Sequence, residues 1–233
     1  MTGKLYGVGL GPGDPDLMTL RAHRLISEAR VVAYPTLAGA HSFARSIAAQ
    51  VIPDGAREIV MDVPMTTARE PAQAAYDAGA AEIAAVLEAG CDVVCLCEGD
   101  PFFYGSFMYL FARLSGRFDV EVVPGVTSIT ACAARAGLPL AARNERLTVL
   151  PGPLPEGELR ARIEGAESVA IMKVGRHLAK IRGVIDALGF TDQAVYVERA
   201  TLAEEVICPL AEAPEKAPYF SMILLTKGAD PWL

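Results

Sequence analysis

The sequence predicts an α/β protein with two α/β domains: residues 1–118 with a mostly parallel sheet, and residues 124–233 with a mixed sheet. Over the first half, short apolar strand patterns alternate with helical patterns, as in strands joined by crossover helices. The segment Asp92–Cys97 is apolar on both faces, which is typical of a central parallel strand covered by helices. Near the C-terminus, strand patterns follow one another without helices between them, which indicates antiparallel neighbours and a mixed sheet.

The chain begins with an expected strand over residues 4–8, which runs into the glycine-rich turn Gly9–Gly13. Asp14 is placed to cap a helix whose first residue is Pro15, because proline has no N–H to leave unpaired there. The apolar stripe of this helix is expected to comprise Leu17, Leu20, Leu25 and Ala29. A second strand is then expected to end at Pro35.

A long helix is expected over residues 71–89, ending at Gly90, a residue type that readily takes the left-handed conformation found after helices. The strand 92–97 follows and runs into the turn 98–101. An aromatic-rich helix is then expected over residues 105–114.

The second half is expected to follow a boundary between Ser115 and Pro124, with a strand over residues 120–123. Pro124–Gly125 makes a turn into a helix that Thr127 or Ser128 can cap. Later helices are expected over residues 156–164 and 177–188. Later strands are expected over residues 147–150, 169–172, 194–197, 205–208 and 221–225.

The composition excludes several classes of protein. A formal net charge of −7 argues against a nucleic-acid binder, which needs a basic face to neutralise phosphates. No apolar run approaches the roughly 18 residues that span a bilayer, and the N-terminus shows no signal-peptide pattern, so we expect a cytoplasmic protein. The 5 cysteines lack paired C-x-x-C spacing and the 3 histidines lie far apart, so we expect buried, inert thiols and no metal site.

The turn Gly7–Gly13 invites comparison with nucleotide-binding motifs. A P-loop is absent, because no G-K-[ST] follows. A G-x-G-x-x-G fingerprint read from Gly7 or Gly9 places Pro12 or Asp14 where the last glycine should stand. The G-x-G-x-G spacing of many methyltransferases does occur, but without the acidic residue that binds a ribose. The glycines alone are equally consistent with a tight strand-to-helix turn.

Three longer segments resemble the tetrapyrrole methylases. Tyr6–Ala22 resembles the opening signature of that family, Glu98–Gly105 its second signature, and Pro124–Ser128 its third, in the same order and at matching spacing. The resemblance extends over essentially the whole chain. It implies two α/β domains with a cleft between them, in which S-adenosyl-L-methionine binds as co-substrate without a dinucleotide fingerprint.

The resemblance also implies particular site residues. Those matching the cofactor contacts are Pro12, Gly99, Asp100, Phe103, Thr127, Ser128, Met172, Ala200, Thr201, Ser221 and Met222. Some have simpler explanations, since Met172 is suited to a core and Thr127 to a helix cap. Asp100, Glu98 and Tyr104 are the candidates for a base that removes the proton from the methylated carbon, and Asp100 and Tyr104 are the predicted catalytic residues. Lys173 and Arg176 are the candidates for binding the substrate carboxylates, since basic side chains pair with them.

Within the family, Phe102–Tyr109 together with Val32–Pro35 is similar to the enzymes that methylate C20 of precorrin-2 in cobalamin biosynthesis. Enzymes of the anaerobic route, which act on cobalt-factor II, share these features. We therefore expect a small-molecule tetrapyrrole as substrate and, from the family, a homodimer, with no nucleic-acid or membrane partner. A non-catalytic nucleotide-binding relative of the same fold is the alternative.

Overall fold

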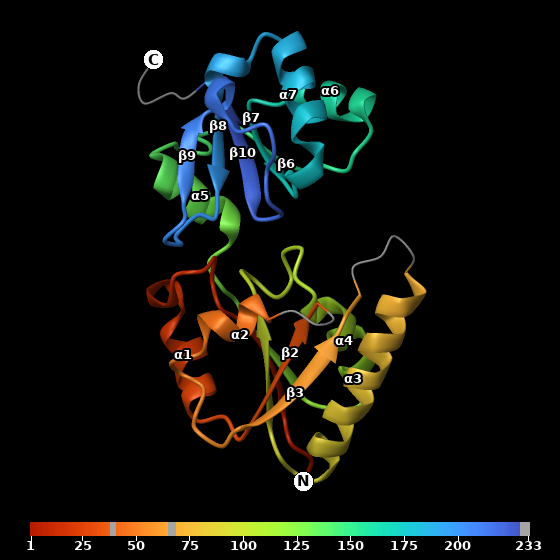
Figure 1. Ribbon diagram of the computed structural model, residues 1–233. Helices are drawn as coiled ribbons and strands as arrows, with labels where there is room; N and C mark the ends of the chain where they lie inside the picture. Colours follow the sequence, from red (N-terminus) through yellow and green to blue (C-terminus); the bar gives the residue numbers. More distant parts are fainter. Residues whose placement is uncertain (38–40, 65–68, 229–233) are drawn as a thin grey trace. The chain divides into compact units, whose positions relative to one another are not determined.

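A computed structural model describes residues 1–37, 41–64 and 69–228 of the chain (Figure 1). The chain divides into two compact units, Met1–Thr127 and Ser128–Leu233. The first contains a parallel sheet and the second a mixed sheet, so the predicted α/β class is confirmed. The domain limits proposed above, and a cofactor cleft between the domains, stay predictions.

The sheet of the first unit has the strand order β3-β2-β4-β1-β5, and its paired strands are all parallel. Its strands are β1 (Leu5–Gly9), β2 (Val31–Thr36), β3 (Arg57–Asp62), β4 (Val93–Cys97) and β5 (Val120–Val123). Every residue of the central strand β4 is buried, as its apolar pattern predicts. Because the strands are parallel, their carboxyl ends, with the loops that follow β1, β4 and β5, share one edge of the sheet.

Helices cover both faces of this sheet. These are α1 (Leu20–Ser27), α2 (Phe43–Ile47), α3 (Glu70–Glu88) and α4 (Phe107–Leu114). One apolar core lies under α3 and α4, and the other lies under α1 and α2 (Figure 1). Gly90 follows α3 with φ +80°, the left-handed conformation expected after that helix.

The helix predicted to start at Pro15 is two separate pieces. Asp14 accepts a hydrogen bond from the backbone N–H of Asp16 at 2.9 Å and caps only a short 3-10 turn, η1 (Pro15–Leu17). The extended residue Met18 then interrupts the helix. The hydroxyl of Thr19 accepts from the N–H of Ala22 at 3.1 Å and starts α1.

This interruption changes the apolar face that the sequence predicts. Ala22 and Ile26 are the buried residues of α1, whereas Leu20, which belonged to the predicted stripe, is 84% exposed. Ala29 of the predicted stripe belongs to the core under α1 and α2, and Leu25 packs against it, so the departure is confined to Leu20 beside the second cap.

The limits of strand β2 also differ from the prediction. The strand continues through Pro35 to Thr36 while paired with β3, although its described pairing with β4 ends at Ala33. Proline is tolerated where a strand borders an unpaired side, because its missing N–H is not needed there. Strand β3 and helix α2 were not predicted from the sequence.

The second unit has the strand order β6-β7-β10-β8-β9. Its strands are β6 (Leu147–Pro151), β7 (Ser168–Met172), β8 (Ala194–Glu198), β9 (Val206–Pro209) and β10 (Ser221–Thr226). Strands β6 and β7 are parallel, and the other neighbouring pairs are antiparallel. The five strands predicted for this half are confirmed, and each of their limits lies within one residue of the prediction.

Helices also lie on both faces of the second sheet. They are α5 (Ser128–Ala136), α6 (Glu156–Glu164) and α7 (Leu178–Ala187), with 3-10 turns η2 (Gly175–His177), η3 (Thr191–Gln193) and η4 (Leu210–Glu212). Ile223 and Leu225 of β10 belong to the core under α6 and α7. The alternating residues Met222 and Leu224 are buried on the opposite face, where α5 packs against β8 and β10.

Candidate active site

The loops that follow β1 and β4 are joined by backbone hydrogen bonds. The N–H of Gly11 donates to the carbonyl of Gly99 at 3.2 Å, and the N–H of Gly99 donates to the carbonyl of Gly11 at 2.8 Å. The parallel strands place these loops at the same edge of the sheet. The first two segments that resemble the tetrapyrrole methylases therefore meet in space.

The loop after β5 packs against both of them at close range. A Cβ atom added to Gly125 would lie 2.1 Å from the carbonyl oxygen of Gly99, and one added to Gly9 would lie 2.6 Å from the backbone nitrogen of Gly125. No side chain fits at such distances, so glycine is required at Gly9 and Gly125 for the backbones to touch. All three resembling segments thus form one structure at this sheet edge.

The carboxylate of Asp100 ties two of these loops together. Its Oδ1 accepts hydrogen bonds from the N–H groups of Phe102 at 2.9 Å and Phe103 at 3.1 Å. Its Oδ2 accepts from the N–H of Gly125, on the next loop, at 3.1 Å. Both carboxylate oxygens are thus used to shape the loop on which the predicted cofactor contacts lie.

The rest of this loop presents aromatic side chains. Tyr104 is 44% exposed and has φ +57°, a left-handed conformation that is uncommon for a residue with a side chain. Its ring lies edge-on to that of Phe103, with centroids 5.3 Å apart. Phe102 is 49% exposed and packs edge-on against Phe111 of α4. The loop therefore combines backbone strain with exposed rings, a combination found at ligand sites.

In the second unit, three strand ends bring other predicted contacts together. Strands β7 and β8 both run antiparallel to β10, so their carboxyl ends flank its amino end. Met172 pairs directly with Met222, and Ser221 pairs with Glu198. Ala200 lies just beyond the end of β8. Five of the predicted contacts, counting Thr201, therefore lie at one end of the mixed sheet.

The side chains of this strand end differ in how accessible they are. Met172 is partly exposed, whereas Met222 is 3% exposed and Ser221 is 7% exposed. The hydroxyl of Ser221 donates to the carbonyl of Pro218 at 2.7 Å and accepts from the N–H of Gly175 at 3.3 Å. Met172 can offer a ligand its side chain, while Ser221 and Met222 mainly hold the strand end in place.

Backbone strain is concentrated at the same strand ends. Among residues 1–37, 41–64 and 69–228, the residues other than glycine with positive φ are Tyr104, Arg143, Lys173, Arg199 and Thr201. Three of these five follow β7 or β8 directly. Such conformations persist where the surroundings fix them, and they gather at functional sites. This strain is a signal that the sequence pattern does not contain.

The basic residues after β7 have different surroundings. Lys180 donates to the carbonyl of Gly152 at 2.8 Å, and Arg182 donates to the carbonyl of Ala213 at 3.1 Å, so both hold neighbouring loops. Arg176 is exposed on the turn η2, and Lys173 lies at the end of β7. The predicted substrate contacts are thus the two residues nearest the strand end.

A local positive field acts on the neighbouring imidazole. Burial, together with the positive charges of Lys180 and Arg176, lowers the pKa of His177 below its ordinary value. The Nε of Arg176 lies 3.5 Å from Nε2 of His177. This part of the surface therefore suits a ligand that carries negative charge.

The predicted contacts divide between the units. Those in the first unit are Pro12, Gly99, Asp100, Phe103, Tyr104 and Thr127, and those in the second are Ser128, Met172, Lys173, Arg176, Ala200, Thr201, Ser221 and Met222. Two residues outside the predicted contacts also shape these loops: the backbone N–H of Gly125 donates to Asp100, and the carboxylate of Glu205 accepts from the N–H of Thr201. Gly125 lies within the third signature, Pro124–Ser128, and that motif is the feature of the sequence that indicates it.

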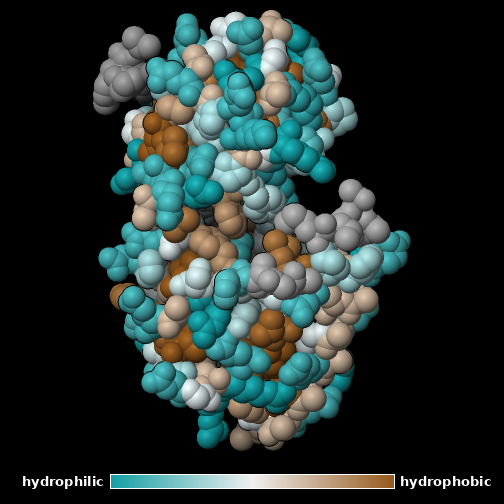
Figure 2. Space-filling view, in the orientation of Figure 1, coloured by the Kyte–Doolittle hydropathy of each residue, from teal (hydrophilic) through white to brown (hydrophobic). Residues whose placement is uncertain are grey.

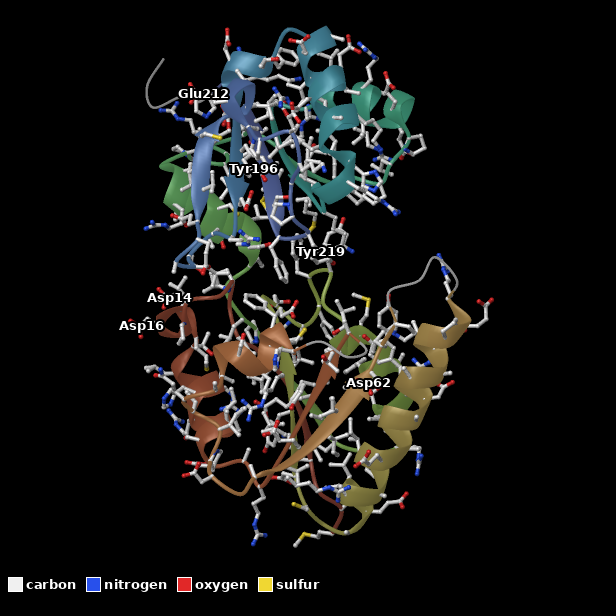
Figure 3. The ribbon with its side chains drawn as sticks, in the orientation of Figure 1. Asp14, Asp16, Asp62, Tyr196, Glu212 and Tyr219 are labelled. Carbon is white, nitrogen blue, oxygen red and sulfur yellow. The ribbon has the colours of Figure 1, made fainter. Side chains whose placement is uncertain are left out.

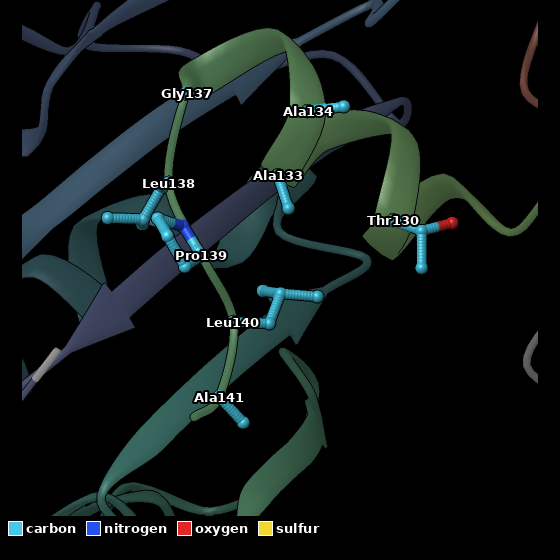
Figure 4. Close-up of a pocket in the computed structure, with 8 residues that line it drawn as sticks. All are labelled: Thr130, Ala133, Ala134, Gly137, Leu138, Pro139, Leu140 and Ala141. Atoms are coloured by element: carbon cyan, nitrogen blue, oxygen red, sulfur yellow. The ribbon is translucent and has the colours of Figure 1, made fainter. Parts of the chain in front are cut away.

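A hollow elsewhere contains none of the predicted contacts. It has a volume of about 510 Å³, is shallow and is lined by α5 and the segment after it (Figure 4). Its lining residues are Thr130, Ala133, Ala134, Gly137, Leu138, Pro139, Leu140 and Ala141. In the view of Figure 2 the surface of each unit is mixed, with small apolar areas among hydrophilic ones.

In the part of the chain that the structure describes, no helix is long and apolar enough to cross a membrane. Across those same residues, no group of three or more His, Cys, Asp or Glu side chains is placed to hold a metal ion.

The first unit combines a parallel sheet with three joined loops, and the second combines a mixed sheet with strained strand ends. The chain belongs to the tetrapyrrole (corrin/porphyrin) methylases, whose family model matches residues 4–214. It is 44% identical to the precorrin-2 C(20)-methyltransferase of a Sinorhizobium species, over 98% of this chain and 97% of that protein. It is 33% identical to the cobalt-precorrin-2 C(20)-methyltransferase of Salmonella typhimurium, over 97% and 98%.

A solved structure supports the same relationship. The uroporphyrin-III C-methyltransferase of Thermus thermophilus, in complex with S-adenosyl homocysteine, superimposes with a TM-score of 0.67 at 29% identity. The match covers 95% of this chain and 97% of that one. The similarity therefore extends over nearly the full length of both proteins.

Proposed function

We propose that this chain is an S-adenosylmethionine-dependent methyltransferase that adds a methyl group to C20 of precorrin-2, giving precorrin-3A in cobalamin biosynthesis. The observation that carries this proposal is the 44% identity to a precorrin-2 C(20)-methyltransferase over nearly the whole of both chains. The lower identity of 33% to the enzyme named for cobalt-precorrin-2 favours the metal-free substrate. The cobalt complex remains the second candidate.

The loops of the first unit fit S-adenosylmethionine as co-substrate. Gly99 has φ +62°, and a Cβ added there would meet no atom of the described residues within 4 Å, so a ligand has room to approach its backbone. In the second unit, Met172 offers an apolar side chain, and Ala200 and Thr201 offer a strained turn. When bound, the sulfonium supplies an already activated methyl group.

Because the methyl group arrives activated, the chain does not need to build a strong nucleophile. Orientation of the two reactants, with exclusion of water, supplies up to about 7–11 kcal/mol of barrier reduction in well-aligned reactions. The loops joined by Gly9, Gly99 and Gly125 form a rigid platform suited to that task.

The catalytic roles of Asp100 and Tyr104 stay predictions. The three hydrogen bonds that Asp100 accepts give its carboxylate a task that needs no proton transfer. Tyr104 is a more exposed group on the same loop and is our candidate for contact with the reacting ring. Lys173 and Arg176 are proposed to bind carboxylate side chains of the tetrapyrrole.

We also propose that the enzyme works in the cytoplasm as a homodimer, on a small-molecule substrate, with no nucleic-acid or membrane partner. The net charge of −7 supports the absence of a nucleic-acid partner. Sedimentation analysis of the purified protein tests the dimer, since a single species at the mass of one chain would contradict it.

The proposed activity is tested by incubating the purified protein anaerobically with S-adenosylmethionine and either metal-free precorrin-2 or its cobalt complex. We expect the mass of the metal-free ring to rise by one methyl group. A gain confined to the cobalt complex would move the enzyme to the anaerobic route. Tight S-adenosylmethionine binding without methylation of either ring would contradict the proposed substrate.

A further inference from the structure

The turn after β8 is held in an unfavourable backbone conformation. Arg199 has φ +47° and Thr201 has φ +72°, on either side of the buried residue Ala200. A left-handed conformation is a true outlier for a β-branched residue such as threonine. Each such residue costs free energy, and its conformation persists only where the surroundings fix it. Neighbouring groups must therefore hold this turn.

Two carboxylates, one on each side, contact the turn. Glu198 pairs with Arg199 at 3.0 Å and also accepts a hydrogen bond from the buried hydroxyl of Tyr196 at 2.8 Å (Figure 3 labels Tyr196 within the second sheet). Glu205 accepts a hydrogen bond from the backbone N–H of Thr201 at 2.7 Å. Both carboxylate side chains are only 11% exposed.

Glu205 is in turn anchored to helix α5. The Nε of Arg135 lies 2.9 Å and 3.0 Å from the two oxygens of Glu205, and its Nη2 lies 2.6 Å from Oε1. The guanidinium of Arg135 lowers the pKa of Glu205, which therefore stays ionised at neutral pH. Arg135 stands in the last turn of the helix that begins at Ser128, another predicted cofactor contact.

We propose that Glu205, held by Arg135, is a positioning residue that keeps Ala200 and Thr201 in the conformation that binds S-adenosylmethionine. This inference rests on the proposed function. The carboxylate does not itself touch the cofactor. Its ion pair with Arg135 of α5 fixes the carboxylate in place, and the carboxylate in turn fixes the orientation of the Thr201 peptide group. Because one acceptor serves both partners, the loss of Glu205 releases the turn and unpairs Arg135 at once.

The test compares Glu205→Ala, Glu205→Gln and Arg135→Ala with the wild-type enzyme. We expect Glu205→Ala to weaken S-adenosylmethionine binding, measured by calorimetry, by about tenfold, as for a lost charge-assisted hydrogen bond. The KM for the tetrapyrrole should stay unchanged. Glu205→Gln should bind S-adenosylmethionine more tightly than Glu205→Ala, because its amide oxygen still accepts a hydrogen bond from the N–H of Thr201. A variant that combines Glu205→Ala with Arg135→Ala should bind S-adenosylmethionine no worse than Glu205→Ala alone, because Arg135 acts through that carboxylate.

A matched control is available in the same unit. Glu167 pairs with Arg146 at 2.7 Å and 3.1 Å, at the start of β7 rather than beyond its end. Glu167→Ala removes an ion pair of the same kind and should leave S-adenosylmethionine binding unchanged. If Glu205→Ala does not fold, Arg135→Ala, which keeps the hydrogen bond to Thr201, replaces it and should weaken binding by a smaller factor.

The outcomes separate this inference from the function on which it rests. If the wild-type chain binds S-adenosylmethionine and the folded Glu205→Ala variant binds it equally well, the positioning role is overturned and the function stands. An equal loss in the Glu167→Ala control would also overturn it, because the effect would then be general. If the wild-type chain binds no S-adenosylmethionine, both the proposed function and this inference fall.

Discussion

The carboxylate of Asp100 accepts hydrogen bonds from backbone groups of Phe102, Phe103 and Gly125. The sequence around Asp100 is typical of a turn, but in the structure its carboxylate also connects two loops that are far apart along the chain. The glycines act in the same way, because the contact between Gly9 and Gly125 exists only without side chains. Single residues here specify backbone geometry more than they specify chemistry.

Substitution of Asp100 separates positioning from proton transfer. In Asp100→Asn one carboxylate oxygen becomes an amide nitrogen, so at least one of the three backbone hydrogen bonds is lost. We expect the free energy of unfolding to fall by about 1–3 kcal/mol, measured in urea, and S-adenosylmethionine binding to weaken in parallel. A variant with normal stability and normal cofactor binding, but without turnover, would instead assign Asp100 to proton transfer.

The basic residues after β7 allow a second prediction for single side chains. Lys173→Ala and Arg176→Ala should each raise the KM for the tetrapyrrole by about tenfold while leaving the Kd for S-adenosylmethionine unchanged. Arg162→Ala, on the exposed side of α6, is the matched control and should change neither constant. Equal losses of substrate and cofactor binding would contradict the assignment.

Helix α7 offers a test of element stability that is independent of the site. Gly183 lies inside this helix, and a Cβ added there would meet no atom of the described residues within 4 Å. Gly183→Ala should therefore stabilise the protein by about 0.5–1 kcal/mol, because alanine loses less backbone entropy in a helix.

The opposite result is expected for Gly125→Ala, whose Cβ would lie 2.1 Å from a carbonyl oxygen. We expect a loss of about 1–3 kcal/mol, as in other overpacked positions. Thermal unfolding measures both changes in stability: Gly183→Ala should be more stable than the wild-type protein, and Gly125→Ala less stable. Equal stability for Gly125→Ala would show that the loops separate freely.

The strands and helices differ in how well their sequences predict them. The sequence predicts strand β4 because each of its residues is apolar, and all of them are buried in the structure. Strand β3 was missed because it is an edge strand in which Ile59 and Met61 are the buried residues, between charged and exposed neighbours. The first helix was predicted as one piece because both Asp14 and Thr19 are good caps, and a pattern of apolar spacing cannot show that both are used.

For the whole chain, the three signatures indicated the family and the candidate residues, but not how those residues are held. Met172, Thr201 and Ser221 reach one end of a sheet because β7 and β8 are antiparallel to β10. Strand order of this kind depends on distant pairing, which local patterns do not encode. The strain at Thr201 and its hydrogen bond to Glu205 likewise became visible only in three dimensions.

The position of the transferred methyl group tests the central claim most directly. The purified enzyme is given precorrin-2 and S-adenosylmethionine labelled with 13C in its methyl group, and the product is examined by NMR. We expect one labelled methyl group, bonded to the meso carbon C20. A labelled methyl group on any other carbon, or a product without label, would contradict it.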